Sequence, residues 1–189
     1  MSATPCDGYV ELVSRLDAAV KAGRDEAIGQ QVKRDLEELI TARRLRLPDR
    51  FRQPRPDCYA RRLLHRDPQL AYTAVVMTWG PGQRTALHDH AGIWCVEGVV
   101  EGAMEVTRYD LVEERNGVFR FSEEGRVRAA VGSAGSLIPP FEYHVLANAL
   151  ETPSITLHIY GGEMDHCHVF EPRPDGGYER RLRTLSYHE

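Results

Sequence analysis

The segment Gly82-Gln-Arg-Thr-Ala-Leu-His88-Asp-His90 decides the fold of this chain and carries its first candidate chemistry. Side chains alternate between the two faces of a β-strand, so His88 and His90 would share one face and Asp89 would point the other way. Two imidazoles on one face can bind the same metal ion. An isolated His-x-His also fits two surface histidines, and the rest of the sequence has to distinguish the two cases.

The eight histidines and four cysteines are unevenly placed. Only His65 precedes residue 88, and the other histidines are His88, His90, His144, His158, His166, His168 and His188. The cysteines Cys6, Cys58, Cys95 and Cys167 form no Cys-x-x-Cys pair, which favours reduced thiols over a disulfide framework. The histidine asymmetry indicates chemistry in the second half of the chain.

Composition bounds the class of protein. A chain of 189 residues with 42% hydrophobic and 28% charged residues is typical of one globular domain. A net charge of −4 provides no basic excess for nucleic acid. No apolar run approaches the roughly 18 residues of a membrane span, and the start of the sequence does not resemble a secretion signal. We therefore expect a cytoplasmic protein with neither membrane nor nucleic-acid partners.

The first 57 residues have a helical pattern followed by a break. Apolar residues recur at helical spacing from Tyr9 to about Arg46, which predicts two amphipathic helices separated at Gly23. Asp25 is a candidate cap of the second helix, whose interior Gly29 is unfavourable for helix formation. Three prolines between residues 47 and 57 prevent a third helix. We expect residues 1–57 to be a helical cover and connector.

Residues 58–189 alternate between short strand-like segments and turns rich in Gly, Pro and Asn. The candidate strands are 59–65, 71–79, 93–100, 103–111, 118–122, 127–131, 145–149, 154–160, 166–171 and 178–185. Strands this short and this closely spaced favour an antiparallel sandwich or small barrel, which hides the edges of its sheets. The predicted fold is mainly β, with one domain covering residues 1–189.

The spacing around His88 resembles the first motif of the cupin barrels. That motif has a Gly, five residues, His-x-His, four residues, a Glu, six residues and a second Gly. The matching positions here are Gly82, His88, His90, Cys95 and Gly102. Only the acidic position differs, since it is occupied by Cys95.

The second cupin motif is matched further along the chain. It has a Pro, a His five positions later and an Asn four positions after that, as do Pro139, His144 and Asn148. Phe141 stands where the motif has a Gly. The resemblance implies a cupin-type barrel in which His88, His90 and His144 bind a metal ion.

A cysteine at the acidic position is similar to the cysteine dioxygenases, or thiol dioxygenase family. Two further patterns of that family agree: Tyr59-Ala60-Arg61 matches its Tyr-x-Arg, and the segment 156–160 matches its Ser-x-His-x-Tyr with Thr in place of Ser. The resemblance runs from about residue 58 to residue 170. It implies a mononuclear non-haem Fe(II) enzyme that adds both atoms of O₂ to a thiol.

The chemistry of three imidazoles agrees with that implication. Without a carboxylate ligand, the charge of a divalent metal ion stays unneutralised and about half of its coordination positions stay open. A thiol with a pKa of about 8.5 is mostly protonated in the cytosol, but metal coordination deprotonates it. Substrate thiolate and O₂ could then bind side by side. Fe(II) suits electron transfer from sulfur to O₂, although imidazoles alone would also accept Zn, Ni or Mn.

The resemblance also assigns roles to the flanking residues. Arg61, with Tyr59, would bind a substrate carboxylate, because a guanidinium makes two parallel charge-assisted hydrogen bonds; the alternative is a surface arginine beside Arg62. His158 would orient the Tyr160 hydroxyl toward the thiolate, and Thr156 would support His158. The relatives that oxidise mercaptopropionate commonly have Gln instead of this Arg, so Arg61 favours cysteine.

Cys95 and Tyr160 match the pair that forms a thioether crosslink in vertebrate cysteine dioxygenases. The crosslink would fix the phenol beside the iron. Many bacterial members have Gly in place of this Cys. The alternative for Cys95 is a free, buried cysteine on a core strand.

Three hypotheses about function follow, two for different substrates and one without catalysis. The leading one is oxidation of L-cysteine to cysteine sulfinate, a step of cysteine catabolism. Trp94 and Gly161-Gly162 are features similar to those of bacterial enzymes that oxidise other thiol acids. The first rival substrate is therefore 3-mercaptopropionate or mercaptosuccinate. The second carboxylate of mercaptosuccinate would need a further cation, for which Arg84, Arg181 or Arg183 is available. The last rival is a cupin that binds metal and ligand without catalysis. We expect a monomer or weak homo-oligomer.

Overall fold

The computed structural model describes residues 6–21, 23–69 and 71–189, so the first five residues of the predicted cover lie outside it. The chain begins with helices α1 (Tyr9–Val20) and α2 (Asp25–Thr41) and a 3-10 turn, η1 (Asp49–Phe51). The strands follow in the order β1 (Ala60–Arg66), β2 (Thr73–Trp79), β3 (Leu87–His88), β4 (Cys95–Glu101), β5 (Ala103–Arg115), β6 (Val118–Ala130), β7 (Ala134–Leu137), β8 (His144–Asn148), β9 (Ser154–Tyr160), β10 (His166–Pro172) and β11 (Tyr178–Thr184).

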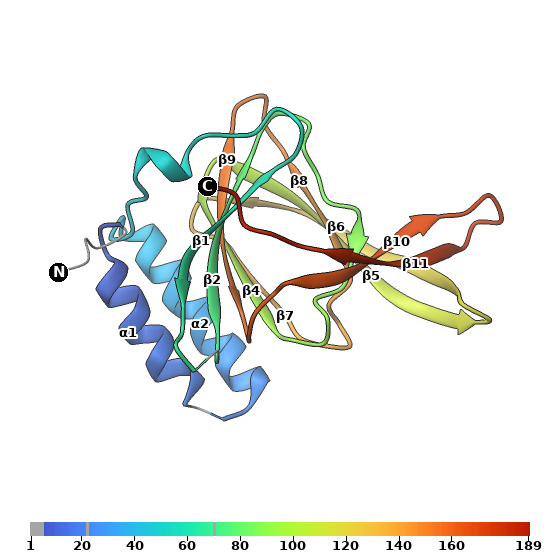
Figure 1. The fold of residues 1–189 in the computed structure, drawn as a ribbon, viewed down its shortest axis with the longest axis horizontal. Helices are drawn as coiled ribbons and strands as arrows, with labels where there is room; N and C mark the ends of the chain where they lie inside the picture. Colours follow the sequence, from blue (N-terminus) through green and yellow to red (C-terminus); the bar gives the residue numbers. More distant parts are fainter. Residues whose placement is uncertain (1–5, 22, 70) are drawn as a thin grey trace.

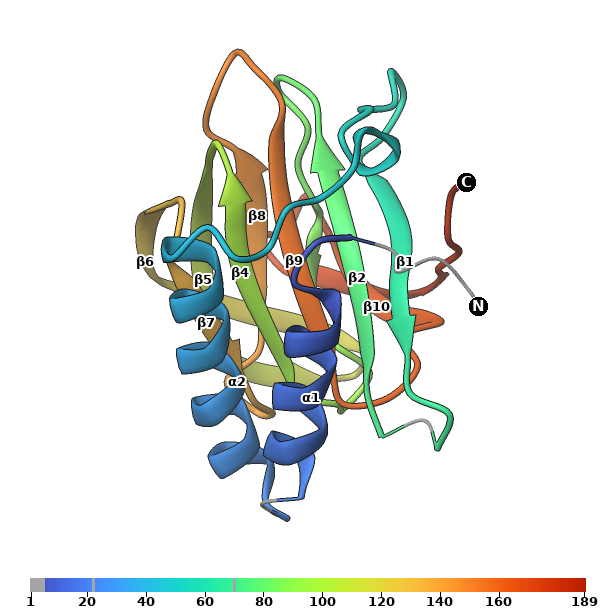
Figure 2. The same ribbon diagram turned by 90° about the vertical axis from the view of Figure 1, so that its left-hand side faces the viewer.

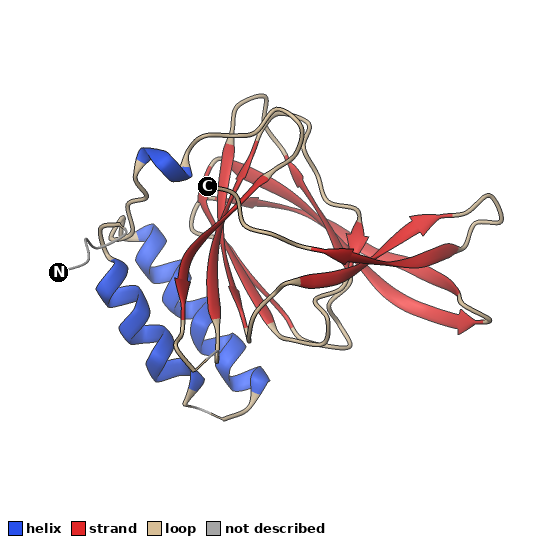
Figure 3. Ribbon diagram, viewed as in Figure 1, coloured by secondary structure: helices blue, strands red, loops and turns tan. Residues whose placement is uncertain are grey.

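Two antiparallel sheets make up the body of the molecule (Figures 1 and 3). The first sheet has five strands in the order β1-β2-β9-β4-β7. The second has the order β10-β11-β6-β5-β8-β3 and closes on itself, because β3 also pairs with β10. The prediction of a mainly β, antiparallel barrel with N-terminal helices is confirmed.

The helices cover the outer face of the five-stranded sheet (Figure 2). Leu36 and Ile40 of α2 belong to the same buried apolar cluster as Val96 of β4 and Leu157 of β9. Full burial of one such side chain stabilises the fold by about 1.5–3 kcal/mol. Gly29, unfavourable for a helix, has a packing reason: a Cβ there would lie 2.6 Å from the Ser136 hydroxyl of β7.

Strand β9 separates the two layers of the core as its alternating pattern predicts. Ile155, Leu157 and Ile159 pack with the helices. Tyr160 belongs instead to the cluster between the two sheets. Because neighbouring side chains alternate, Thr156 and His158 point to the same side as Tyr160. The polar face of β9 therefore faces the barrel interior.

Three local predictions are wrong. Residues 118–130 form one strand, β6, rather than two. The polar residues around Gly125 suggest a turn, but most of this part of the β5–β6 hairpin is exposed, so polar side chains fit a strand there. Helix α2 begins at Asp25, and no side chain caps it. His88 and His90 do not share a strand, because β3 ends at His88; β3 and β7 are also too short for periodicity to reveal them.

The turn at the tip of this hairpin follows its sequence. Asn116 and Gly117 both have positive φ, of 52° and 75°, as the two central residues of a type I′ turn require.

No helix in the described part of the chain is long and apolar enough to cross a membrane.

Candidate metal centre

His88, His90 and His144 come together between the two sheets. His88 ends β3 and pairs in register with His144, the first residue of β8, while His90 follows β3 by two residues. The Nε2 atoms of His88 and His144 are 3.2 Å apart, and the ring centroids of the three pairs are separated by 4.6–5.2 Å. His90 and His144 are buried, with 1% and 0% of their surfaces exposed.

A hydrogen bond at Nδ1 of His88 leaves Nε2 of that ring to bind a metal ion. Nδ1 of His88 lies 3.0 Å from the Ala86 carbonyl, to which it can only donate. Nδ1 of His90 lies 3.4 Å from a carboxylate oxygen of Glu142 without a hydrogen bond between them. Among the described residues, both ring nitrogens of His90 and Nδ1 of His144 have no hydrogen-bond partner. A buried nitrogen without a partner is costly, and a bound metal ion at Nε2 of His90 would remove that cost.

Burial keeps the imidazoles of His88 and His144 neutral. It lowers the pKa of His88 to about 4, with a smaller contribution from His90, and it lowers the pKa of His144 well below its usual value. Metal ions bind the neutral imidazole. The donor set of three converging imidazoles therefore fits a divalent first-row metal ion.

Two carboxylates beside the triad were missed from the sequence, of which Glu142 is buried and the Glu97 side chain is 11% exposed. Glu142 accepts a hydrogen bond of 2.7 Å from the backbone N–H of His90. Glu97, on β4, has a carboxylate oxygen 3.4 Å from Nε2 of His144 and 3.5 Å from Nδ1 of His158. The signal for Glu97 is an acidic residue two positions after Cys95 in an otherwise apolar strand, which places both on one face.

Burial alone would raise the pKa of Glu97. The imidazoles of His144 and His158 outweigh that effect and hold the pKa below its usual range.

A hydrogen-bonded row leads along β9 to the triad. The indole N–H of Trp79 donates to Thr156 Oγ1 at 2.9 Å, and Oγ1 lies 2.7 Å from Nε2 of His158. Trp79 can only donate, so Thr156 Oγ1 accepts from the indole, and the direction of its bond with Nε2 depends on the tautomer of His158. Nδ1 lies 3.4 Å from the Tyr160 hydroxyl. Burial raises the pKa of Tyr160 well above its usual value, so the phenol keeps its proton.

A small cavity of about 30 Å³ lies beside the triad and is lined by Tyr59, Arg61, His88, His158 and Tyr160. Arg61 is only 4% exposed, which excludes the alternative of a surface arginine. Its two terminal nitrogens donate to the carbonyls of Ser186 and Met164, while Nε has no partner among the described residues.

Several other lining residues clarify what this cavity can hold. The Tyr59 ring stacks on Trp79 with centroids 4.4 Å apart. Of the three spare cations, Arg183 lines this cavity, whereas Arg181 makes a hydrogen bond of 2.8 Å to Glu179 on the surface. Arg84 does not line it. A second cationic group therefore accompanies Arg61.

Cys95 and Tyr160 are directly opposite each other in the pairing of β4 with β9. Cys95 is a buried free thiol, and burial raises its pKa well above the usual value.

Two other histidines, His166 and His168, pair with carboxylates outside the triad. Nδ1 of His168 lies 2.9 Å from Asp89, and Nδ1 of His166 lies 2.6 Å from Asp165.

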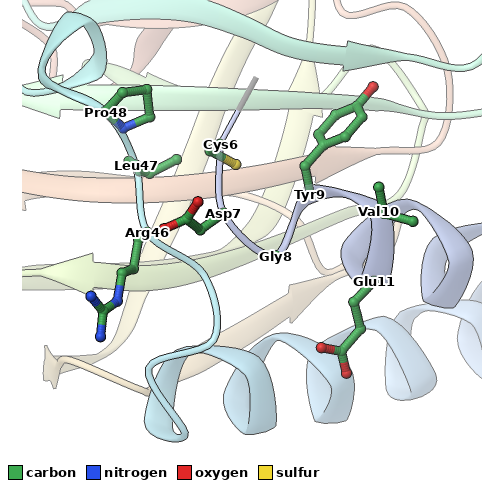
Figure 4. Close-up of a pocket in the computed structure, with 9 residues that line it drawn as sticks. All are labelled: Cys6, Asp7, Gly8, Tyr9, Val10, Glu11, Arg46, Leu47 and Pro48. Carbon is green, nitrogen blue, oxygen red and sulfur yellow. The ribbon is translucent and has the colours of Figure 1, made fainter. Parts of the chain in front are cut away.

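A larger cavity, of about 570 Å³, lies away from the triad at the start of α1 (Figure 4). It is lined by residues 6–11 and 46–48, none of which the sequence predicts to be functional.

An antiparallel double-sheet barrel with a histidine cluster between its sheets defines the cupin class. Residues 49–173 match the family model described as cysteine dioxygenase type I, and the chain belongs to this family. It is 23% identical over 118 residues to cysteine dioxygenase type 1 of Rattus norvegicus and 22% identical over 126 residues to that of Homo sapiens. Each match covers 62% of this chain and 56% of the relative. The chain thus spans about half the length of these curated relatives.

Solved structures with a related fold include two bacterial proteins. The protein TT1209 from Thermus thermophilus matches with a TM-score of 0.47 and 20% identity, covering 60% of this chain and 92% of that protein. An uncharacterized protein with a double-stranded β-helix domain from Klebsiella pneumoniae matches with a TM-score of 0.44 and 20% identity, covering 61% and 88%.

Proposed function

We propose that this protein is a thiol dioxygenase that uses Fe(II) to oxidise a small thiol carboxylate, with L-cysteine as the first candidate substrate. The observation that carries the proposal is the convergence of His88, His90 and His144, of which His88 lines one cavity together with His158, Tyr160 and Arg61. The reaction is RSH + O₂ → RSO₂H. The sulfur loses four electrons, O₂ gains them, and both oxygen atoms end on the sulfur.

His88, His90 and His144 would hold the metal ion. When bound, Fe(II) would supply a centre at which a substrate thiol loses its proton and the resulting thiolate reacts with O₂. The remaining work falls to the protein's own side chains.

Arg61 would bind the substrate carboxylate. Its buried guanidinium is already fixed by two backbone carbonyls, and Nε is left to donate to the substrate. A preorganised cation loses little entropy when its ligand binds. Orienting the carboxylate would aim the thiol at the histidine triad.

The protonated Tyr160 hydroxyl would donate a hydrogen bond to the reacting sulfur or oxygen. The Tyr160 hydroxyl lies 3.4 Å from Nδ1 of His158, and Thr156, itself bonded to Trp79, holds the His158 ring in place. A protein that only bound metal and ligand would have no evident need for this row. The row therefore favours catalysis over simple binding.

Arg183 supports a second candidate substrate. Because it lines the same cavity as Arg61, a thiol with two carboxylates, such as mercaptosuccinate, would find two cations. 3-Mercaptopropionate has one carboxylate, so it would leave the second cation without a partner on the substrate.

Oxygen consumption tests the proposal. Protein loaded anaerobically with Fe(II) is supplied with cysteine, mercaptosuccinate or 3-mercaptopropionate, and sulfinate products are identified by mass spectrometry. We expect cysteine to give one O₂ consumed per sulfinate formed. Uptake with mercaptosuccinate alone would replace the first candidate by the second, and no uptake with any thiol would contradict the proposed activity.

A further inference from the structure

The segment that follows β11 lies beside Arg61 and outside residues 49–173, which match the family model. It pairs with β1, the outermost strand of the five-stranded sheet (Figures 1 and 2). The backbone N–H of Arg61 donates to Nδ1 of His188 at 3.0 Å, and the N–H of His188 donates to the Arg61 carbonyl at 2.7 Å. A strand at the edge of a sheet otherwise leaves such groups unpaired. His188 therefore completes the edge of β1 at the position of Arg61.

The same segment contacts the Arg61 guanidinium. The Ser186 carbonyl accepts a hydrogen bond of 3.2 Å from one terminal nitrogen, and the other nitrogen donates to the Met164 carbonyl at 3.1 Å. The guanidinium carbon lies 5.2 Å from the centroid of the Tyr187 ring. An aromatic face attracts a cation most strongly where water is excluded, and Arg61 is only 4% exposed. Three consecutive residues, Ser186, Tyr187 and His188, thus contact one arginine.

Tyr187 is held in place by its hydroxyl group. The hydroxyl donates to the Glu163 carboxylate at 2.7 Å. Arg66, at the end of β1, donates two hydrogen bonds of 2.7 and 2.9 Å to the same carboxylate. The Tyr187 ring therefore cannot move away from Arg61 without breaking its bond to Glu163.

The contacts of this segment also fix the direction of the Arg61 Nε–H group. Leu185 of the segment and Arg183 of β11 line the cavity of about 30 Å³ together with Arg61. Nε is the side-chain nitrogen of Arg61 that has no hydrogen-bond partner among the described residues. Because a guanidinium is planar and rigid, fixing its two terminal nitrogens and its face fixes Nε as well.

We propose that Tyr187 and His188 are positioning residues that hold Arg61 in the orientation in which it binds the substrate carboxylate. This inference rests on the proposed function, in which Arg61 is the carboxylate-binding residue. His188 fixes the Arg61 backbone and Tyr187 fixes its guanidinium, and neither of them lines the cavity. A cation that is already oriented loses little entropy when its ligand binds. Loss of either residue therefore weakens binding of the thiol carboxylate.

Binding of a thiol carboxylate to Co(II)-loaded protein without O₂ tests the inference. Cysteine and mercaptosuccinate are titrated, and the change in the visible absorption of Co(II) on thiolate binding gives Kd without turnover. Tyr187→Leu removes the aromatic ring, and Tyr187→Phe keeps the ring and loses the bond to Glu163. The matched control is Tyr178→Leu, which removes a partly buried tyrosine that packs on Phe121 and does not line the cavity.

We expect Tyr187→Leu to raise Kd by about 5- to 30-fold, as loss of a desolvated contact between a cation and a ring does. Tyr187→Phe should have a smaller effect, and Tyr178→Leu should have none. His188→Ala should also raise Kd. His188→Asn should recover most of the affinity, because its side-chain oxygen can accept the hydrogen bond from the Arg61 N–H. Urea unfolding shows that each variant is folded.

Combination with Arg61→Gln separates positioning from a general structural role. If Tyr187 acts through Arg61, Tyr187→Leu should change Kd by less than about twofold in a protein that already carries Arg61→Gln. A structural effect that does not pass through Arg61 would weaken binding by the same factor with and without Arg61→Gln.

Two results would overturn the inference and leave the proposed function in place. Tyr187→Leu and His188→Ala could bind the thiol carboxylate as tightly as the unaltered protein does, or the effect of Tyr187→Leu could be equally large in both backgrounds. A different result would contradict the proposed function and the inference together: the unaltered protein could bind Co(II) and show no spectral change with either thiol.

Discussion

At the scale of single residues, burial holds the reactive groups of the centre in defined protonation states. It keeps the Tyr160 phenol and the Cys95 thiol protonated, because it raises the pKa of each. Neither group is a nucleophilic anion in the resting protein. Any bond between them needs an oxidant.

Cys95 and Tyr160 are placed to form a thioether. They lie opposite each other across β4 and β9, and a carbon–sulfur bond between the ring and Sγ releases two hydrogens, with O₂ as the oxidant. After prolonged turnover with Fe(II), thiol and O₂, we expect part of the protein to be lighter by two hydrogens in intact-mass spectra. Cys95→Ala should show no such loss. An unchanged mass of the unaltered protein after exhaustive turnover would contradict this prediction.

Arg61 should control the affinity for the substrate carboxylate. Arg61→Gln removes a charge-assisted hydrogen bond of about 1.5–3 kcal/mol, so KM for the thiol acid should rise about 10- to 100-fold while kcat changes less. Steady-state oxygen uptake measures both constants. The neighbouring Arg62 is also buried but bonds to the Gln53 carbonyl and does not line the cavity. Arg62→Gln should therefore lower stability and leave KM unchanged; equal KM effects in both variants would exclude the role of Arg61.

At the scale of secondary-structure elements, Trp94 and Gly161, the two features similar to bacterial enzymes that oxidise other thiol acids, are in contact with each other. Trp94 precedes β4 and is 4% exposed, and Gly161 follows β9. A Cβ at Gly161 would lie 2.3 Å from Nε1 of the Trp94 indole. The large ring thus requires the small residue. This contact joins the two segments that carry Cys95 and Tyr160.

Gly161→Ala should lower the free energy of unfolding by about 1–3 kcal/mol, because the added methyl overfills a packed contact. Trp94→Leu combined with Gly161→Ala should cost less than the sum of the two single changes, since the smaller side chain leaves room for the methyl. Urea unfolding gives these values. Gly135→Ala on β7 is the matched control, because nothing lies within 4 Å of its added Cβ. Strict additivity of the first pair would show that the contact does not constrain Gly161.

The pairing of α1 with α2 should depend on pH through Glu38. Hydrogen bonds from Arg15 and Arg44 lower the pKa of Glu38 to about 2. A lowered carboxyl pKa stabilises the folded state fully above the ordinary value near 4.5, and this stabilisation is lost as the pH falls toward 2.

The Tm advantage of the unaltered protein over Glu38→Gln should therefore shrink between pH 5 and pH 2. It should also be small and sensitive to salt, because these side chains are exposed. The Glu37 carboxylate oxygen is 3.9 Å from Lys33 Nζ. The Tm advantage of the unaltered protein over Glu37→Gln should therefore shrink less over the same pH range. An advantage that stays constant over this pH range would exclude the mechanism.

At the scale of the whole molecule, the alternation of polar and apolar residues along a strand predicts which face of the strand points into the barrel. It does not predict which side chains of different strands come into contact. The alternation of Thr156, His158 and Tyr160 with apolar neighbours correctly places one face of β9 toward the interior, because strand geometry is local. The position of Glu97 beside His144 depends on how β4 approaches β8, and no local rule of one sequence gives that distance. The short strands β3 and β7 were missed for a similar reason: pairing with other strands, rather than their own periodicity, defines them.

Because the ligands come from distant parts of the chain, a bound metal ion should stabilise the whole barrel. His88 and His90 precede His144 by more than fifty residues, with the β5–β6 hairpin between them, so binding links segments that separate on unfolding. A ligand that binds only the folded state adds about 2.7 kcal/mol at a concentration 100 times its Kd. Adding Co(II) to metal-free protein should raise Tm progressively with concentration, and a chelator should reverse the rise. His88→Ala should lose the effect, while His166→Ala, which changes an exposed histidine paired with Asp165, should retain it. A Tm of His88→Ala that rises as steeply as that of the unaltered protein would place the stabilising ion outside the triad.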